Sequence, residues 1–331
     1  MEEFSVTLRL HPKPEARIFA VKPINMESRA NEAYKASIIW RILFLISLLA
    51  VIVLLYRDIR RGWDREIKPP DLVQQDTLHI IDTVCGNQYM QMAVLFQQQS
   101  AEFRALSIQG FSVALEALKE DLMDKSVTRR RAIITDIDET ILDNSPYQAE
   151  CVLSGISYPE GWDEWCLEAS AAALPGALAF CQTASKYGVD VFYVTNRKEH
   201  LRDATRQNLL ELGFPLKDDE HLIMRTASSD KEARRQEIAA KYHVSLLLGD
   251  NLNDFYGSYY HADPRRRAEL TDSLSRLFGK RYIVFPNPMY GDWESALYGE
   301  QDTLDQDAKM ALRNTKLQGF RQLAAPSSAL Q

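Results

Sequence analysis

Cysteine is scarce in this sequence, and its spacing argues against a zinc site. The 331 residues include four cysteines, at positions 85, 151, 166 and 181. No two of them form a CxxC pair, and none has the Cys/His spacing of a zinc-binding motif. An even number allows disulfides in an oxidising compartment, where Cys151 and Cys166 would be the first pair to test. The other interpretation is four buried thiols, because free cysteine packs as a small hydrophobic residue.

An excess of positive charge is also lacking. The chain has 39 Lys and Arg against 46 Asp and Glu, a net charge of −7, so we expect no nucleic-acid partner. A small anionic substrate is still compatible, because a local site need not follow the net charge. Internal repeats and low-complexity tracts are absent, and 46% hydrophobic with 26% charged residues is typical of a globular chain.

Residues 36–56 form a long hydrophobic run, ASIIWRILFLISLLAVIVLLY, with Arg41 as its one charge. As a helix, residues 42–56 would rise about 22 Å and the whole run about 31 Å, close to the ~30 Å core of a bilayer. Arg41 can extend toward the head groups. We predict a single-pass transmembrane anchor at 36–56, between an N-terminal lead at 1–35 and a linker at 57–75.

The residues beside this run favour an uncleaved anchor. The run continues into RDIRR without a small-residue cleavage site, and no cysteine follows directly that could accept a lipid. Met26 is a second candidate start and would leave a short basic lead. Lys22, Arg29 and Lys35 precede the run, whereas five basic residues follow it between 57 and 68. By the positive-inside rule, this count favours a cytoplasmic C-terminal part.

Helical and strand patterns alternate in the rest of the chain. Apolar residues recur at threes and fours between 76 and 124, which predicts helix. Strand-like runs at about 132–134, 189–195, 221–225, 244–250 and 281–286 are interleaved with helical patterns near 198–212, 229–242 and 263–278. This alternation predicts an α/β fold, a three-layer Rossmann-like parallel sheet. Residues 143–176, rich in Pro, Tyr and Trp, predict a small cap, and we expect the tail at 315–331 to be loosely ordered.

Polar side chains follow three of the predicted strands. They are Asp136 and Asp138, then Thr195, Asn196 and Arg197, then Asp250 and Asp254. Because the carboxyl ends of parallel strands converge on one crevice, we expect these residues to meet, with Lys231 beginning a helix on the same edge. Alone, each would be a turn, a cap or a surface residue. Together they form an oxygen-rich site that suits Mg²⁺ and phosphoryl transfer.

These motifs resemble those of a known family. DIDET at 136–140 has the form DxDxT, and TNR at 195–197, Lys231 and GDNLND at 249–254 follow in order. The longer stretches ITDIDETILDNSPYQ (134–148), VFYVTNRK (191–198) and IVFPNPMYGDWESAL (283–297) are similar to class C acid phosphatases. These are the lipoprotein e type 5'-nucleotidases of the haloacid dehalogenase (HAD) superfamily. The resemblance covers roughly 87–300 and implies an acid phosphatase domain at 76–314 with the HAD fold.

The resemblance implies the chemistry of the site. Asp136 would be the nucleophile, forming an aspartyl-phosphate, and Asp138 would be the general acid/base. Asp136, Asp138 through its backbone carbonyl, and Asp250 would bind Mg²⁺, with Asp254 supporting the metal shell. We expect Glu139 and Asp143 to be loop or surface groups.

The resemblance also implies how a substrate is bound. Thr195, Asn196 and Lys231 would hold the phosphoryl oxygens, with Arg197 as a further candidate. The substrate would be a small phosphomonoester such as a nucleoside monophosphate, hydrolysed at acidic pH. Four aromatic side chains are candidates for gripping the base, with core or cap packing as the other interpretation: Trp162, Trp165, Tyr256 and Tyr260.

A different class of function is a phospho-acceptor, or a non-catalytic module that binds Mg²⁺ and phosphate at the membrane. Receiver domains lack an acid two residues after the acceptor, so Asp138 favours the enzyme. The family is exported, which favours an extracytoplasmic (in a bacterium, periplasmic) catalytic domain against the charge count. Family members usually carry a lipid-accepting cysteine, which this sequence lacks. A homo-oligomer is compatible with the sequence.

Overall fold

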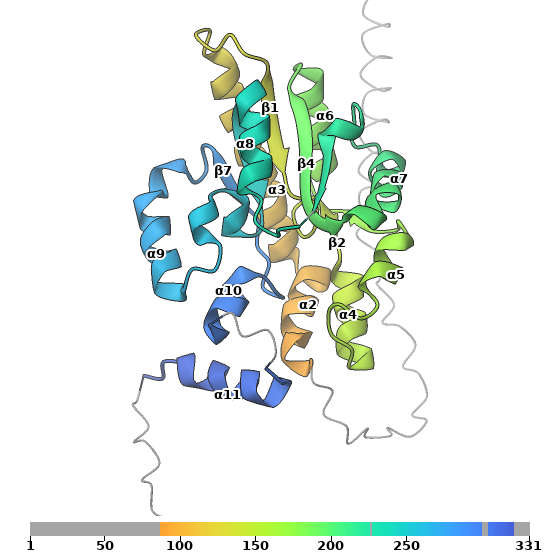
Figure 1. The fold of residues 1–331 in the computed structure, drawn as a ribbon, viewed down its shortest axis with the longest axis vertical. Helices are drawn as coiled ribbons and strands as arrows, with labels where there is room; N and C mark the ends of the chain where they lie inside the picture. The colour runs from red at the N-terminus through yellow and green to blue at the C-terminus, as the bar shows by residue number, and fades with distance from the viewer. Residues whose placement is uncertain (1–86, 226, 300–303, 321–331) are drawn as a thin grey trace, which may run out of the picture. The chain divides into compact units, whose positions relative to one another are not determined.

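The computed structural model describes residues 87–225, 227–299 and 304–320, and Figure 1 shows their fold. The predicted lead, anchor and linker lie outside the described residues, so the anchor, its topology and the localisation stay predictions. Within the described ranges, none of the helices combines the length and hydrophobicity that a membrane span requires.

Five parallel strands form the central sheet, in the order β5-β4-β1-β6-β7. Their bounds are β1 (Arg131–Thr135), β4 (Asp190–Lys198), β5 (Leu222–Arg225), β6 (His243–Gly249) and β7 (Tyr282–Val284). Each strand coincides with a predicted run, so the predicted parallel sheet is confirmed. Because β1 lies between β4 and β6, the residues that follow β1 emerge at the middle of the carboxyl edge.

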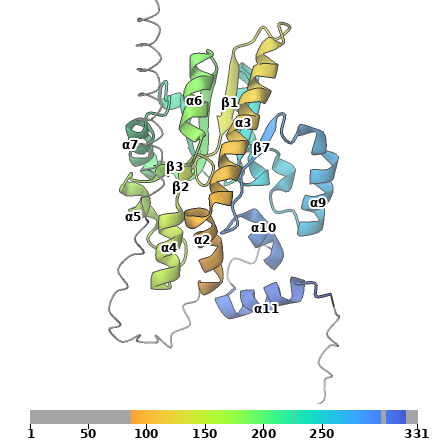
Figure 2. The ribbon, with the colours of Figure 1, turned by 180° about the vertical axis from the view of Figure 1, so that it is seen from behind.

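Helices cover both faces of the sheet, which confirms the three layers. Successive side chains of a strand point to opposite faces. Ile133 accordingly belongs to the core cluster beneath α3 (Ala101–Met123), α6 (Ala177–Lys186) and α7 (Arg202–Leu212). Ile134 packs in the opposite cluster with Ile238 of α8 (Glu232–Lys241). Figure 1 views the α8 side, and Figure 2 views the α3 and α6 side.

The predicted helical stretch at 76–124 contains two α-helices within the described residues. They are α2 (Gln91–Gln99) and α3, and Ser100 separates them with an extended backbone. The Ser100 hydroxyl accepts a hydrogen bond from the Phe103 N–H at 3.0 Å, which caps α3. A serine inside an apolar periodic pattern is therefore a helix start here. Residues 76–86 of the predicted stretch lie outside the described residues.

The predicted cap at 143–176 contains α4 (Ser145–Ser154) and α5 (Trp162–Leu167). It also contains a short strand that the pattern did not predict, β3 (Ala172–Ala173), which pairs antiparallel with β2 (Leu142–Asp143). The helix α9 (Pro264–Ser273) comes before β7 in the chain. After β7 the chain forms α10 (Asp292–Ser295) and α11 (Gln306–Lys316). The helix α11 was not predicted, and it extends two residues into the predicted tail.

The cysteines within the described ranges are buried free thiols. These are Cys151, Cys166 and Cys181, so the disulfide between Cys151 and Cys166 is not formed, and Cys85 lies outside the described residues. Burial raises the pKa of each of the three thiols. They pack as small hydrophobic side chains.

At Gly110, inside α3, a methyl group would improve the helix propensity but would crowd the Phe285 ring. A Cβ there would lie 2.6 Å from Cε1 of Phe285. That ring is also held by Phe111, whose centroid is 4.4 Å away. Alanine stabilises a helix interior by about 1 kcal/mol relative to glycine, whereas overpacking typically costs about 1–3 kcal/mol. We expect Gly110→Ala to lower the free energy of unfolding in urea by about 1 kcal/mol.

Ser112→Ala lies on the exposed side of the same helix and also removes a hydrogen bond from its hydroxyl to the Ile108 carbonyl, so it should be neutral or slightly stabilising. Combining Gly110→Ala with Phe285→Leu should cost less than the sum of the two single changes, because the smaller side chain makes room for the methyl group. A Gly110→Ala protein more stable than the wild type would show that the Phe285 ring moves aside freely.

Candidate active site

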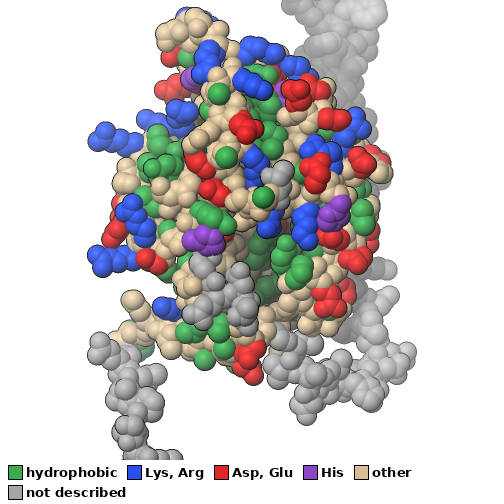
Figure 3. Space-filling view, viewed as in Figure 1, with side chains coloured by type: hydrophobic (Ala, Val, Ile, Leu, Met, Phe, Trp, Pro, Cys, Tyr) green, Lys and Arg blue, Asp and Glu red, His purple; other side chains and the backbone are tan. Residues whose placement is uncertain are grey.

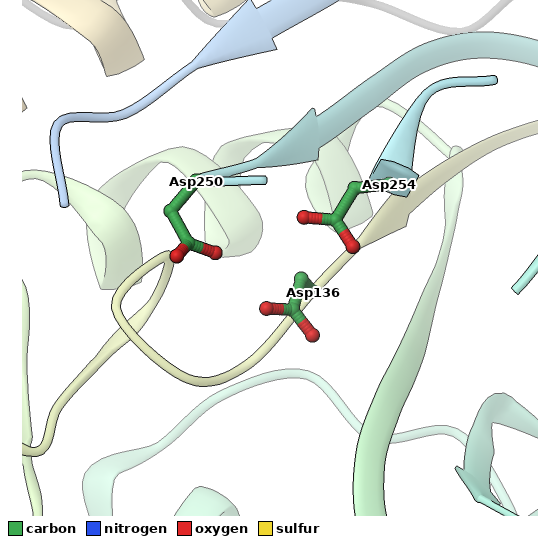
Figure 4. A group of neighbouring side chains, drawn as sticks. All are labelled: Asp136, Asp250 and Asp254. Carbon is green, nitrogen blue, oxygen red and sulfur yellow. The ribbon is translucent and has the colours of Figure 1, made fainter. Parts of the chain in front are cut away.

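Three carboxylates converge where the central strands end. The Asp136 N–H donates to the Leu248 carbonyl at 2.9 Å, which continues the β1–β6 pairing beyond β1. Asp250 follows β6 directly, and Asp254 lies in the short 3-10 turn η4 (Leu252–Asp254). One oxygen from each of Asp136, Asp250 and Asp254 lies within 4.8 Å of the others. Figure 4 shows the three side chains together. The sequence prediction that β1 and β6 deliver acids to one point is confirmed.

Lys231, directly before α8, contacts two of these carboxylates. Its Nζ donates to Oδ1 of Asp136 at 2.5 Å and to Oδ1 of Asp254 at 2.6 Å. The side chain is buried. Burial alone would lower the pKa of Lys231, but the charges of Asp136 and Asp254 outweigh it and raise that pKa. The ammonium is therefore charged at any physiological pH.

The carboxylates carry more negative charge than Lys231 balances. Burial raises the pKa of Asp136 well above its ordinary value against the opposing charge of Lys231, and the neighbouring aspartates raise it further. Burial, and next the charge of Asp254, raises the pKa of Asp250 to about 7. Three convergent carboxylates with one ammonium are a donor set that fits a divalent cation with a preference for hard oxygen ligands. The residues present therefore fit Mg²⁺.

Two side chains fix the orientation of Asp250. Thr140 Oγ1 donates to Asp250 Oδ1 at 3.3 Å, and Asn287 Nδ2 donates to Oδ2 at 2.8 Å. Sequence reasoning missed Asn287, although it follows β7 as Asp250 follows β6. The carboxyl-end rule, applied to that edge strand as well, would have found it.

Gly249 is required by the close approach of Asp254. A Cβ at position 249 would lie 2.4 Å from Asp254 Oδ2. The same Oδ2 accepts the backbone N–H of Asn251 at 3.1 Å, which holds the Asp254 side chain in this place. The glycine of the GDNLND motif thus makes room for a carboxylate.

Asp138 points to a different set of partners. Its Oδ1 accepts from Arg197 Nε at 2.9 Å and Nη2 at 2.8 Å, and from Asn144 Nδ2 at 2.9 Å. Its carboxylate is not part of the group formed by Asp136, Asp250 and Asp254. The predicted metal contact of Asp138, through its backbone carbonyl, stays a prediction.

Arg197, the further candidate phosphate ligand, donates to protein acceptors, and its contact with phosphate stays a prediction. Its side chain is 2% exposed and donates to Asp138, to Thr205 Oγ1 at 3.2 Å and to Asn144 Oδ1 at 3.2 Å. A buried guanidinium is stabilised by a carboxylate and neutral acceptors within reach of its fork of donors. The guanidinium therefore holds Oδ1 of Asp138 from within the protein interior.

Glu139 lies in the loop after β1, as predicted, but the expectation of a surface group is wrong. Its side chain is completely buried and its φ is +57°. Its carboxylate accepts from the Asn144 N–H at 2.9 Å and from the Tyr290 hydroxyl. Burial, and next the charge of Asp138, raises the pKa of Glu139 to about 8. Tyr290 is distant in sequence, so the local pattern gave no sign of this contact.

Asp143 also has internal partners. It is half-buried in β2 and accepts from Gln97 Nε2 at 2.7 Å and from the Ser145 N–H at 2.9 Å. It ties the start of α4 to α2 and lies outside the carboxylate group.

Thr195 and Asn196, predicted phosphate ligands, lie at the carboxyl end of β4. Thr195 is buried and its Oγ1 accepts the Arg197 N–H at 3.0 Å. Asn196 is exposed, and its Oδ1 accepts from Arg234 Nη2 at 2.7 Å. Arg234 also donates to the Thr195 carbonyl at 2.7 Å, which fixes this strand end. Nothing in the sequence distinguished Arg234 from a surface residue of a charged helix.

A cavity of about 410 Å³ adjoins this edge. Its lining includes Tyr89, Tyr158, Trp162, Asn196, Arg197, Tyr290 and Lys309. Figure 3 shows the surface of this side of the molecule, hollowed near its middle and bordered by side chains of both charges.

Of the four aromatic candidates, Trp162 lines this cavity. Trp165 instead packs against the core, and its Nε1 donates to Asn144 Oδ1 at 2.8 Å. The hydroxyl of Tyr260 pairs with Ser229 at 3.0 Å, and Tyr256 is 41% exposed. Trp165, Tyr256 and Tyr260 are not among the residues that line the cavity.

Buried acids determine how stability changes with pH. In the metal-free protein, the pKa values of Asp136, Asp250 and Glu139 lie above their ordinary 3.8 and 4.5. The folded chain thus binds more protons than the unfolded chain between about pH 4.5 and 8, so stability falls as pH rises through this window. With a chelator present, we expect Tm to fall by roughly 5 °C from pH 5.5 to 8. Glu139→Gln, which cannot ionise, should reduce this slope.

Glu102→Gln, an exposed change in α3, should leave the slope unchanged. Mg²⁺ should oppose the slope, because metal ligands bind in their ionised form and the affinity rises with pH. An unaltered slope in Glu139→Gln would contradict a protonated, buried Glu139.

Comparison with known proteins agrees with this geometry. Residues 73–293 match the family model of the HAD superfamily, subfamily IIIB (acid phosphatase). The chain is 31% identical over 170 residues to Acid phosphatase 1 of Solanum lycopersicum, a stretch that covers 47% of this chain and 57% of that protein. The chain thus spans just over half the length of this relative.

The class C acid phosphatase of Bacillus anthracis has a similar structure, with a TM-score of 0.70 and 37% identity over 72% of this chain and 100% of that one. The same enzyme with tungstate bound has a TM-score of 0.69 and 37% identity, over 72% of this chain and 99% of its own. The resemblance to class C acid phosphatases is confirmed. Because the family model matches well over half of the residues, the chain belongs to the acid phosphatases of HAD subfamily IIIB.

Proposed function

We propose that this protein hydrolyses phosphate monoesters with the help of Mg²⁺, through an aspartyl-phosphate on Asp136. The observation that carries the proposal is the contact of Asp136 with Lys231 beside two further carboxylates, at the end of the central strand. The similar Bacillus anthracis enzyme has been solved with tungstate, a tetrahedral oxyanion like phosphate. This supports the binding of a phosphate-like oxyanion by a protein of this family.

In the first step, an oxygen of Asp136 attacks phosphorus while the bond from phosphorus to the leaving oxygen breaks. Asp138 gives its proton to that oxygen, and the alcohol departs. Lys231, together with the Mg²⁺ that the neighbouring carboxylates would hold, would keep Asp136 ionised before the attack, and its ammonium would also bind the phosphoryl oxygens. Thr195 and Asn196, at the end of β4, are the proposed further phosphate ligands.

In the second step, Asp138 accepts a proton from water, and the resulting hydroxide attacks phosphorus. The bond from phosphorus to Asp136 breaks, and inorganic phosphate leaves with the free carboxylate restored. Asp136, Asp250 and Asp254, with the carbonyl of Asp138, would hold Mg²⁺. When bound, the ion offsets the charge of the carboxylates and of the phosphoryl oxygens.

Asp136→Asn tests the nucleophile. An amide cannot form the acyl phosphate, so we expect kcat to fall roughly 10³-fold or more in the full chain. EDTA should abolish wild-type activity, and added Mg²⁺ should restore it. The measurement is release of inorganic phosphate from a panel of monoesters between about pH 4 and 8.

Asp272→Asn, on the exposed side of α9, is the matched control and should keep wild-type activity. Substantial turnover by Asp136→Asn would overturn the proposal. A wild-type protein that takes one phosphate from acetyl phosphate onto Asp136 without turnover would instead support the phospho-acceptor alternative.

We further propose that nucleoside 5'-monophosphates are substrates and that Trp162 stacks on the base. Trp162 lines the cavity next to Asn196 and Arg197, within reach of the site. Stacking a base on an aromatic side chain contributes about 1–3 kcal/mol. We therefore expect Trp162→Ala to raise KM for a nucleoside monophosphate ~10-fold, with little change for glycerol phosphate, which has no base.

Trp162→Phe should keep most of the selectivity, because it keeps an aromatic face. Tyr256→Ala, which removes an exposed candidate outside the cavity lining, should affect neither substrate. Equal losses for both substrates in Trp162→Ala would mean that Trp162 supports the structure instead of the base.

A further inference from the structure

We propose that Asn144 and Arg197 are positioning residues that fix the carboxylate of Asp138 for proton transfer, and that Glu139 holds Asn144 in place. The inference deepens the proposed function and rests on it, because it concerns the proton carrier of the same reaction. Among the described residues, Asn144 and Arg197 make no hydrogen bond to Asp136, Asp250 or Asp254. Their action is on Asp138.

The two oxygens of Asp138 are in different surroundings. Oδ1 accepts from Arg197 Nε and Nη2 and from Asn144 Nδ2, all between 2.8 and 2.9 Å. Oδ2 has a longer contact, 3.4 Å from Thr195 Oγ1. Three donors hold Oδ1 and leave little room for a proton on it. The geometry therefore assigns proton transfer to Oδ2.

Asn144 and Arg197 form a clamp around Oδ1 of Asp138, and both side chains are held by further hydrogen bonds. Asn144 is completely buried, and its Oδ1 accepts from Arg197 Nη2 at 3.2 Å and from Trp165 Nε1 at 2.8 Å. Arg197 is anchored at its other end by Thr205. Side chains held by packing and by second hydrogen bonds lose little freedom when they orient a third group.

Glu139 explains why Asn144 keeps its position. Glu139 Oε1 accepts the Asn144 N–H at 2.9 Å, and Oε2 accepts from Asn144 Nδ2 at 3.3 Å and from the Tyr290 hydroxyl. The φ of +57° at Glu139 is uncommon for a residue with a side chain, and its energetic cost must be offset by contacts that hold the residue in place. These hydrogen bonds supply that restraint, and they tie the loop after β1 to the wall of the cavity.

Comparing esters with different leaving groups shows whether Asp138 is positioned to donate its proton. An alkoxide needs the proton of Asp138 as its bond to phosphorus breaks, whereas p-nitrophenolate is stable enough to leave without it. A displaced Asp138 therefore slows the hydrolysis of alkyl phosphates more than that of p-nitrophenyl phosphate. The ratio of kcat/KM for the two esters measures this difference, because kcat/KM reports the transfer of phosphate to Asp136 and excludes its later release.

Asn144→Ala and Arg197→Lys, made in the full chain, test the clamp. The Lys variant keeps the charge but cannot bridge Asp138, Thr205 and Asn144 at once. We expect kcat/KM for glycerol phosphate to fall at least ~10-fold more than for p-nitrophenyl phosphate, since general acid catalysis contributes roughly 10²–10⁴-fold. Glu139→Gln should change the ratio in the same direction by less.

Asn208→Ala and Arg267→Lys are matched controls. Both side chains are buried and hydrogen-bonded to a backbone carbonyl, that of Ala171 and of Tyr259, respectively. If either control changes stability, it should lower kcat/KM for both esters equally. Thermal unfolding of every variant identifies those that fail to fold, and Glu139→Gln and Arg197→Lys are the mildest changes.

The two proposals fail in different ways. If folded Asn144→Ala and Arg197→Lys lower kcat/KM for both esters by the same factor while Asp136→Asn is inactive, the positioning role is wrong and the proposed function stands. If Asp136→Asn retains full turnover, the proposed function itself is wrong. A selective loss for the alkyl ester supports the clamp.

Discussion

The ammonium of Lys231 between Asp136 and Asp254 is the interaction on which the carboxyl edge depends. Like charges a few Å apart repel by roughly 4 kcal/mol per pair at an effective dielectric near 20. The sheet nevertheless delivers three carboxylates to one point, because β1 lies beside β6 and both end there. Lys231 can offset part of that repulsion because it begins α8, whose packing against the sheet fixes its backbone. The remaining negative charge makes this edge fit a divalent cation.

Two cations give the two acids of DIDET different surroundings. Asp136 contacts an ammonium, a compact charge that can turn between a carboxylate and an arriving phosphoryl group. Asp138 contacts a guanidinium, a planar fork that fixes the orientation of one carboxylate oxygen. Residues two apart on a regular strand point to the same face, but β1 ends at Thr135 and the chain enters a turn at Glu139, so one short segment serves both partners. In the proposed mechanism, a nucleophile that changes partners and an acid that keeps its orientation would thereby be separated.

The sequence predicted the sheet and the strand ends because both are local signals. β-rich runs predicted all five strands, and the rule on carboxyl ends predicted that Asp136, Asp250 and Lys231 would meet. Contacts between distant segments were missed. Glu139 looks like a surface acid until Tyr290, 151 positions later, supplies its hydroxyl. Trp165 was a candidate for contacting the base, but in the fold its Nε1 donates to Asn144 Oδ1 inside the cap. Periodicity cannot reveal a partner that only the tertiary fold provides.

The cavity wall and the side chains that hold Asp138 have residues in common, so in the proposed mechanism substrate choice and chemistry would be coupled. Arg197 lines the cavity and also holds Asp138, and Tyr290 lines the cavity and also binds Glu139. A substitution in the wall that moves either side chain therefore also displaces the groups that orient Asp138. Trp162, by contrast, contributes to the wall and makes no hydrogen bond to Asp138 in this network, although the Arg197 guanidinium lies 5.7 Å from its ring. Selectivity can thus change at Trp162 at less cost to catalysis than at Arg197 or Tyr290.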